Sequence, residues 1–165
     1  MQYRSELAGK PEDFVAKGYQ ADLHPKPEFF GMLYAEKWRG IVAKRFQRVV
    51  VGADDKWITG TTGPVQQIKL DEWKTFEIIA KGNKLVHKLN GKVCTEIIDH
   101  NEDGRLMKGV VAIQVHRGPA MRVQVKDVEL KHLPAGGMLS LEDAPISADA
   151  EKVPGRIPKK ARPKM

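Results

Sequence analysis

The sequence is poor in the residues on which several classes of protein depend. Its 165 residues include one cysteine, Cys94, which excludes an intramolecular disulfide framework and a zinc site built from several cysteines. No apolar run approaches the length of a membrane span, and residues 1–10 contain no signal-peptide core. Helical amphipathic periodicity is also scarce, and residues 34–46 could hold a turn or two of helix at most.

The sequence has almost no net charge outside its C-terminal segment. The formal net charge is +7, but residues 152–165 contain six basic residues and no acidic one, which leaves 22 basic and 21 acidic residues elsewhere. We therefore expect no nucleic-acid partner for the nearly neutral body of the chain. Contact of the basic tail with anionic partners is a weaker alternative, which salt-sensitive binding would reveal.

Turn signals are plentiful and separate many short runs that have strand character. The length fits one domain with a hydrophobic core, and the 41% hydrophobic content is ordinary for a globular protein. Regularly spaced short strands predict a sandwich or a barrel, an all-β fold. The turn signals lie at residues 8–11, 24–27, 52–55, 81–83 and 90–91.

The sharpest turn signal predicts a three-stranded meander. Asn90-Gly91 suits a two-residue type I′ turn, which needs positive φ at both central positions. The flanking runs, 73–80, 84–89 and 92–99, alternate apolar and polar residues. We expect their inward-facing residues to be Phe76, Ile78, Ala80, Leu85, Leu89, either Val93 or Cys94, and Ile97.

The composition changes near residue 135. Pro145, Pro154, Pro158 and Pro163 interrupt ladder and helix alike, and few large apolar residues remain to be buried. We therefore divide the chain into a β-domain, 1–134, and a largely disordered, Pro-rich basic tail, 135–165.

Residues 109–133 predict two further strands around a His-Arg-Gly-Pro turn. In the first strand, Val111, Ile113 and Val115 share one face, whereas Gln114 and His116 share the other. An antiparallel sheet often buries one face and leaves the other in water.

Polar residues alternate in the same way in two other segments. Gln20 and Asp22 share a face in 18–24, and Gln2 and Arg4 do so at the start of the chain. If these strands share a sheet, their polar faces form a floor that can bind a ligand.

Four segments in succession carry a resemblance to a known family. They are GYQAD at 18–22, GMLYAEKWRG at 31–40, EWKTFEIIAKGNKLVHKLNG at 72–91 and GVVAIQVHRGPAMRVQVKDVELK at 109–131. Together they resemble the 3-keto-disaccharide hydrolase domain family over roughly residues 1–134. Lys74 stands where the family usually has Asn, and the chain opens inside what resembles the family's Ser-Gly-Ile-x-Tyr-Arg strand. We therefore expect an N-terminally truncated domain.

The resemblance implies a concanavalin A-like jelly roll of two antiparallel sheets in a bacterial protein. It also implies cleavage of 3-keto-glycosides, and a periplasmic or secreted location if an N-terminal segment is missing. A ketone at C3 acidifies the C2 hydrogen, so a base can start an elimination that expels the glycosidic oxygen, and water then adds back. This route needs a general base, donors to the enolate oxygen and groups that hold hydroxyls.

The polar floor supplies candidates for each of these roles. His116 is the first candidate for the base, with Asp22 and Glu36 as rivals. Arg4 and Arg39 suit the enolate or the hydroxyls, unless they form ion pairs at the rim. Gln20, Tyr34 and Gln114 suit sugar binding through hydrogen bonds or stacking.

Two alternatives remain open. A divalent metal held by Asp22, Glu36 or His116 could act as the electrophile, although no tight ligand spacing supports one. The same fold also serves lectins, so a non-catalytic carbohydrate-binding module is the second interpretation of the chain. The oligomeric state is not predicted.

Overall fold

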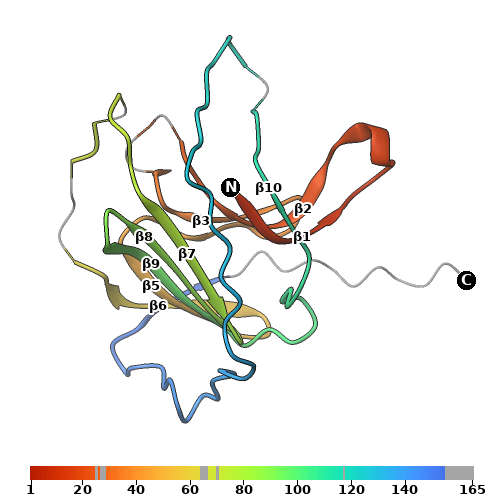
Figure 1. The fold of residues 1–165 in the computed structure, drawn as a ribbon. Helices are drawn as coiled ribbons and strands as arrows, with labels where there is room; N and C mark the ends of the chain where they lie inside the picture. The colour runs from red at the N-terminus through yellow and green to blue at the C-terminus, as the bar shows by residue number, and fades with distance from the viewer. Residues whose placement is uncertain (25, 27–28, 64–66, 70, 117, 155–165) are drawn as a thin grey trace, which may run out of the picture.

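Two β-sheets make up nearly all of the regular structure. The computed structural model describes residues 1–24, 26, 29–63, 67–69, 71–116 and 118–154. Within these residues, regular structure is almost all β-strand, apart from a short 3-10 helix, Pro11–Asp13, and 3-10 geometry at Phe29 (Figure 1). The predicted all-β, jelly-roll type of sandwich is therefore confirmed.

The first sheet has five strands, and all its neighbouring pairs are antiparallel. In spatial order they are β10 (Val110–Ala112), β1 (Gln2–Leu7), β2 (Ala16–Ala21), β3 (Leu33–Glu36) and β4 (Gly40–Ala43). The segment predicted to hold at most a turn or two of helix, 34–46, thus forms most of β3 and all of β4.

The second sheet has six strands and one parallel pair, β5 with β9. In spatial order they are β11 (Glu151–Pro154), β6 (Asp55–Thr61), β5 (Gln47–Val51), β9 (Lys92–Asp99), β8 (Lys84–Leu89) and β7 (Phe76–Lys81). No helix in the described part of the chain is long and apolar enough to cross a membrane.

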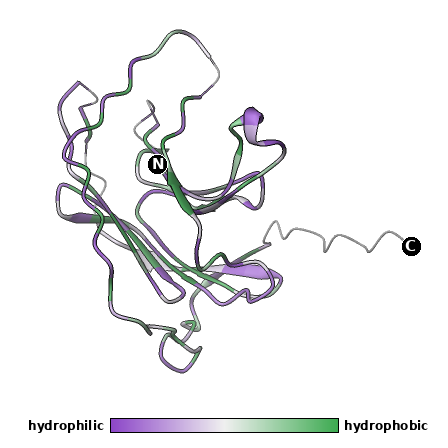
Figure 2. Cartoon of the chain, turned by 45° about the vertical axis from the view of Figure 1, so that its right-hand side comes forward, coloured by the Kyte–Doolittle hydropathy of each residue, from purple (hydrophilic) through white to green (hydrophobic). Residues whose placement is uncertain are grey.

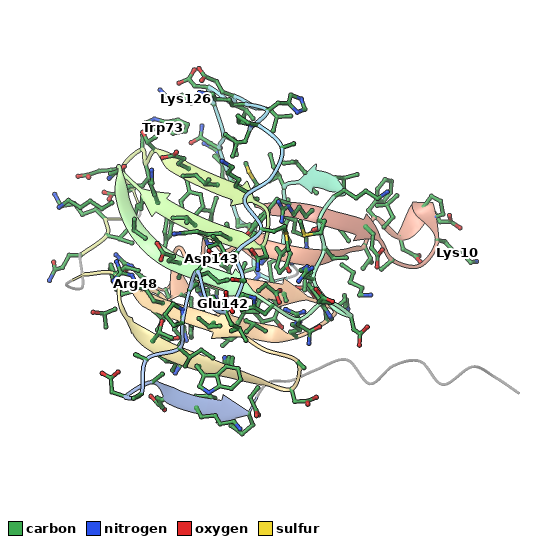
Figure 3. All side chains as sticks on the ribbon, turned by 90° about the horizontal axis from the view of Figure 1, so that it is seen from below. Lys10, Arg48, Trp73, Lys126, Glu142 and Asp143 are labelled. Carbon is green, nitrogen blue, oxygen red and sulfur yellow. The ribbon has the colours of Figure 1, made fainter. Side chains whose placement is uncertain are left out.

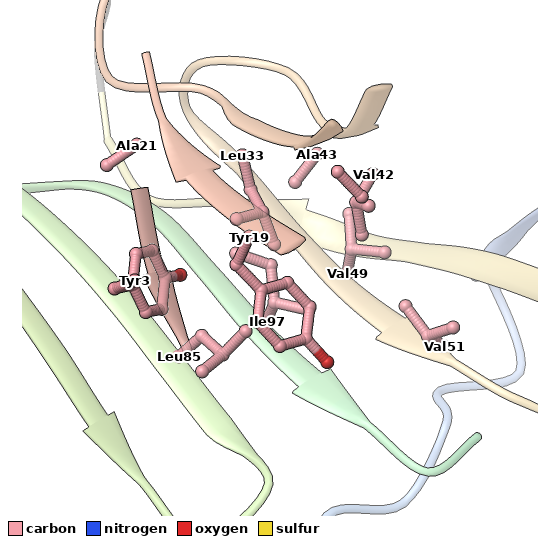
Figure 4. Packing of buried hydrophobic residues seen from close by; sticks show 11 residues of the cluster. Tyr3, Tyr19, Ala21, Leu33, Val42, Ala43, Val49, Val51, Leu85 and Ile97 are labelled. Carbon is pink, nitrogen blue, oxygen red and sulfur yellow. The ribbon is translucent and has the colours of Figure 1, made fainter. Parts of the chain in front are cut away.

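The core lies between the two sheets. Tyr19 and Leu33 from the first sheet meet Val49, Leu85 and Ile97 from the second, and none of the five is more than 2% exposed (Figure 4). Alternate residues of each strand point into this layer, as the two-residue period of a strand requires. The opposite face of each sheet therefore points outward.

The predicted meander is confirmed as β7, β8 and β9. Asn90 and Gly91 both have positive φ, 49° and 77°, as a type I′ turn requires. Leu85, Leu89 and Ile97 are buried as predicted. Of the two alternatives at the start of β9, Cys94 is the buried residue.

The prediction of two strands in 109–133 is wrong for most of that segment. Only Val110–Ala112 pairs, as β10 along the edge of β1, and the described residues from 113 to 133 form no strand. Val111, Ile113 and Val115, expected to face the core, are each more than half exposed. The physical reason is that an extended segment becomes a strand only when a ladder partner is present. Figure 1 shows this segment rising away from β10 and returning toward β7.

The prediction of a disordered tail is wrong for part of 135–165. Glu151–Pro154 forms β11 and pairs with Asp55–Ile58 of β6. Leu139 is also held, because its backbone N–H and C=O bond to the side chain of Asn83. Proline is tolerated in β11 because this strand lies at the sheet edge. Residues 155–165, which hold most of the basic cluster, lie outside the described part.

Candidate functional site

A row of polar side chains crosses the outer face of the five-stranded sheet. Gln2 lies opposite Gln20, and Gln20 lies opposite Tyr34 on the next strand. Their neighbours Tyr3 and Tyr19 point the other way, into the core. Strand alternation therefore places Gln2, Gln20 and Tyr34 on one face, as the sequence predicts for the first two.

The two glutamines form a hydrogen-bonded chain that ends at Asp22. Gln2 Nε2 donates to Gln20 Oε1 at 3.2 Å, and Gln20 Nε2 donates to Asp22 Oδ1 at 3.4 Å. Both glutamines are less than 5% exposed. The centre of this face is therefore buried, whereas the sequence predicted that it would be open to water. Their amides cannot move freely, and they orient the Asp22 carboxylate.

Asp22 has the most perturbed carboxylate of this face. Partial burial raises its pKa, while His24, the N-terminal amine, the Gln20 amide and His116 act in the opposite direction. The backbone of Asp22 is anchored, since its N–H donates to Met32 and its carbonyl accepts from Gly31. A fixed carboxylate whose proton affinity is raised has the properties of a general base.

His116 comes near Asp22 from the segment after β10, which also carries Gln114. His116 is exposed, and its charge lowers the pKa of Asp22, so the two side chains lie within electrostatic reach of each other. Gln114 is half-buried and lies two residues before His116. The structure thus joins Gln20 to Asp22 by a hydrogen bond and brings His116, from a distant segment, within electrostatic range of Asp22.

Tyr34 and Glu36 occupy the same face on β3 at different distances from Asp22. Tyr34 is the direct cross-strand neighbour of Gln20 and is half-buried. Glu36 lies opposite Gly18 on the neighbouring strand. Gly18 precedes Asp22 by four residues, which corresponds to about 13 Å of extended backbone. Tyr34 therefore belongs to the polar row near Asp22, whereas Glu36 lies at the far end of the row.

Arg4 is held at the edge of the second sheet. A register shift in β1 coincides with a φ of +45° at Arg4, and such a bulge redirects a side chain. Its guanidinium donates to the carbonyls of Gly82, at 2.7 Å, and Ala80, at 3.0 Å. Arg4 is thus not brought to Asp22, and these contacts join β1 to the end of β7.

Arg39 lies on the core side of the five-stranded sheet. Its side chain is 5% exposed and forms an ion pair with Asp99 at 2.5 Å. The Tyr19 hydroxyl donates to the same carboxylate. This buried network lies on the opposite side of the sheet from Gln20, so Arg39 and Asp22 do not share a site.

Sequence reasoning missed two residues of this site. Alternation puts Gln2 on the polar face but assigns it no role, although it completes the amide chain to Asp22. His24 was not among the predicted site residues, yet its charge is the first of the influences that lower the pKa of Asp22. Its position two residues after Asp22 was the available signal, because alternation puts both on one side.

The described residues offer no ready set of metal ligands. Nowhere among them do three His, Cys, Asp or Glu side chains gather at a geometry that would hold an ion. Asp22, Glu36 and His116, the ligands considered from the sequence, do not converge. We therefore derive no chemical step through a metal.

Comparison with known proteins gives one match. A family model described as a 3-keto-alpha-glucoside-1,2-lyase-like domain matches residues 1–131. No curated protein and no solved structure matches the chain.

Proposed function

Because the chain belongs to the 3-keto-alpha-glucoside-1,2-lyase-like family, we propose that it cleaves 3-keto-glycosides by elimination followed by hydration. A carbohydrate-related activity follows from the family, whereas the reaction and its residues are our proposal. The observation that carries the proposal is the Asp22 carboxylate, which is held by Gln20 and has a raised pKa. His116 lies within electrostatic range of this carboxylate.

The elimination needs two proton transfers, one from C2 and one to the glycosidic oxygen bound to C1. A base takes the C2 proton, and the electron pair of that C–H bond moves to form an enolate with the C3 carbonyl. The enolate then collapses to a C1=C2 double bond, and the C1–oxygen bond breaks as the leaving oxygen takes up a proton. Water adds to C1 and C2 is reprotonated, which gives a free 3-keto sugar.

Asp22 is the proposed base. Its backbone is fixed by Gly31 and Met32, and Gln20 orients the carboxylate. Burial raises its pKa, which makes the ionised form a stronger base than an exposed aspartate. His116 is the first candidate from the sequence, but its position on an exposed segment suits the second proton transfer better.

His116 is the proposed acid that protonates the leaving glycosidic oxygen. An imidazolium is a competent proton donor near neutral pH, and its position near Asp22 allows one group to act at C2 and the other at the oxygen bound to C1. Tyr34, beside Gln20, is the proposed donor to the enolate oxygen at C3. Gln114 is proposed to bind sugar hydroxyls and the buried Gln20 to hold the Asp22 carboxylate. Arg4 and Arg39 have structural positions.

The test compares a 3-keto-disaccharide with its unoxidised parent and follows release of the free sugar. We expect cleavage of the keto form alone. Asp22→Asn and His116→Gln should each lower kcat by about 10²- to 10⁴-fold, the usual contribution of a general base or acid. The Asp22→Asn change should not unfold the protein near neutral pH, because burial already disfavours the charge of Asp22.

Glu36→Gln is the matched control. This change also removes one carboxylate from the same face, but about 13 Å from Asp22, and activity should be retained. Loss of activity in Glu36→Gln with retention in Asp22→Asn would move the base to Glu36. A folded protein that binds the keto sugar without cleaving it would contradict the enzyme and support the lectin-like alternative.

A further inference from the structure

One extended segment carries much of the exposed apolar surface of the protein. We call residues 121–131 the return segment, because they lead back from the tip of the excursion that follows β10 (Figure 1). Every residue in it is exposed, and its large apolar side chains are between 40% and 77% exposed. The structure records no backbone hydrogen bond for any of these described residues. An extended apolar segment with free N–H and C=O groups is a surface prepared for strand pairing.

The side chains of the return segment divide cleanly into an apolar and a polar side. Met121, Val123 and Val125 alternate with Arg122, Gln124 and Lys126. Figure 2 shows this mixture of hydropathies along the excursion. One residue of the polar side contacts the rest of the protein, since Lys126 Nζ lies 4.7 Å from the ring centroid of Trp73 (Figure 3).

A break in this alternation falls on a residue with unusual backbone geometry. After Lys126 the pattern shifts by one, so that Val128 and Leu130 rejoin the apolar side and Glu129 the polar side. Asp127, at the shift, has a φ of +52°. An extra residue with positive φ is how a β-bulge restores the facing of a strand, so the segment has the pattern of a bulged strand without a partner.

The pattern is self-complementary when the segment is laid antiparallel on a second copy. With Val125 on the two-fold axis and Lys126 and Asp127 counted as one bulge position, Val123 faces the partner's Val128. Met121 faces the partner's Leu130, and Arg122 faces the partner's Glu129. Opposite charges and apolar side chains directly across a ladder stabilise it, and two-fold symmetry makes each contact twice.

We propose that the return segment is a dimerisation strand whose occupant is the same segment of a second copy of this chain. Two features favour a second copy over another partner. The charge order, Arg122 before the bulge and Glu129 after it, is what antiparallel self-pairing requires. The body of the protein is also nearly neutral, with 22 basic and 21 acidic residues outside 152–165, so long-range repulsion between copies is weak. The proposal is independent of the proposed catalytic function.

Charge reversal at the paired positions tests both the partner and the register. Sedimentation equilibrium of the full chain should show a dimer. Arg122→Glu and Glu129→Arg should each shift it toward monomer, because each places two like-charged pairs across the ladder. The double variant, and an equimolar mixture of the two single variants, should both restore the dimer, because opposite charges face each other again.

Lys131→Glu is the matched control, with the same charge change in the same segment but no charged residue opposite, and it should remain dimeric. Circular dichroism checks that all variants are folded, which these exposed positions favour. A monomeric wild-type protein would overturn the proposal. A dimer unaffected by either single reversal would place the interface elsewhere, and failure of the mixture to restore the dimer would overturn the register.

Discussion

At the scale of single residues, the clearest feature is a buried histidine that the fold keeps neutral. His87 is completely buried between the sheets, where its Nδ1 lies 3.2 Å from the Gly31 carbonyl and its Nε2 lies 2.9 Å from the Tyr3 hydroxyl. A carbonyl can only accept, which assigns the proton to Nδ1 and leaves Nε2 to accept from Tyr3. Burial lowers the pKa of His87 from 6.5 to about 4.

This depressed pKa predicts a loss of stability in mild acid. In the unfolded chain His87 binds a proton near pH 6.5, whereas in the folded protein it binds one only near pH 4. The stabilisation is therefore fully present above pH 6.5 and is lost as the pH falls toward 4, by about 3 kcal/mol. Urea unfolding at a series of pH values measures it.

The His87→Gln variant is the control for this prediction. The glutamine amide can donate to the Gly31 carbonyl and accept from the Tyr3 hydroxyl, but it does not titrate. The free energy of unfolding of this variant should fall less steeply with pH than that of the wild type between pH 6.5 and 4. Equal slopes in the two proteins would show that His87 is not the group responsible.

Residue-level prediction from the sequence succeeded for side chains whose strand alternation is regular. Alternation puts Gln20 and Asp22 on the polar face, and the structure joins them by a hydrogen bond. The same reasoning failed for Arg4, whose positive φ turns the side chain toward Ala80 and Gly82. It also could not foresee that Arg39 pairs with Asp99, because that contact joins residues 60 positions apart.

At the scale of elements, the meander β7–β9 shows what local sequence determines. Its turn is encoded in two adjacent residues, and its strands pair with their neighbours in the chain. The edge strand β11 and the unpaired return segment were mispredicted for the opposite reason. Each depends on whether a distant strand offers a free edge, and that information is not present in the segment itself.

The turn between β8 and β9 supports a test at this scale. Gly91 has a φ of +77°, and a side chain in the left-handed region costs about 1–2 kcal/mol. Since an added Cβ would meet nothing within 4 Å, this cost is purely one of backbone conformation. Gly91→Ala should therefore lower the free energy of unfolding by that amount in urea denaturation.

Gly118→Ala is the control for that substitution. An added Cβ there also meets nothing within 4 Å, and its φ lies outside the left-handed region. Its effect should stay within about 0.5 kcal/mol, as for an ordinary surface change. A Gly91→Ala protein as stable as the control would contradict the role of positive φ in this turn.

At the scale of the whole molecule, the buried structural network and the proposed catalytic groups lie on opposite faces of the five-stranded sheet. The layer between the two sheets holds the core and the buried Tyr19–Asp99–Arg39 network. The outer face of the five-stranded sheet holds Asp22 and the groups around it. Because the same fold supports unrelated functions, the assignment of an activity depends on this face and not on the sandwich.

The most direct test of the proposed elimination is cleavage of a 3-keto-disaccharide in D₂O, followed by NMR of the released 3-keto sugar. Removal of the C2 proton and later reprotonation predict deuterium at C2 of the product, above the exchange of the substrate without protein. The unoxidised parent should remain intact, and Asp22→Asn should abolish both cleavage and enzyme-dependent labelling. Cleavage that leaves C2 unlabelled, or that consumes the parent equally well, would contradict the account.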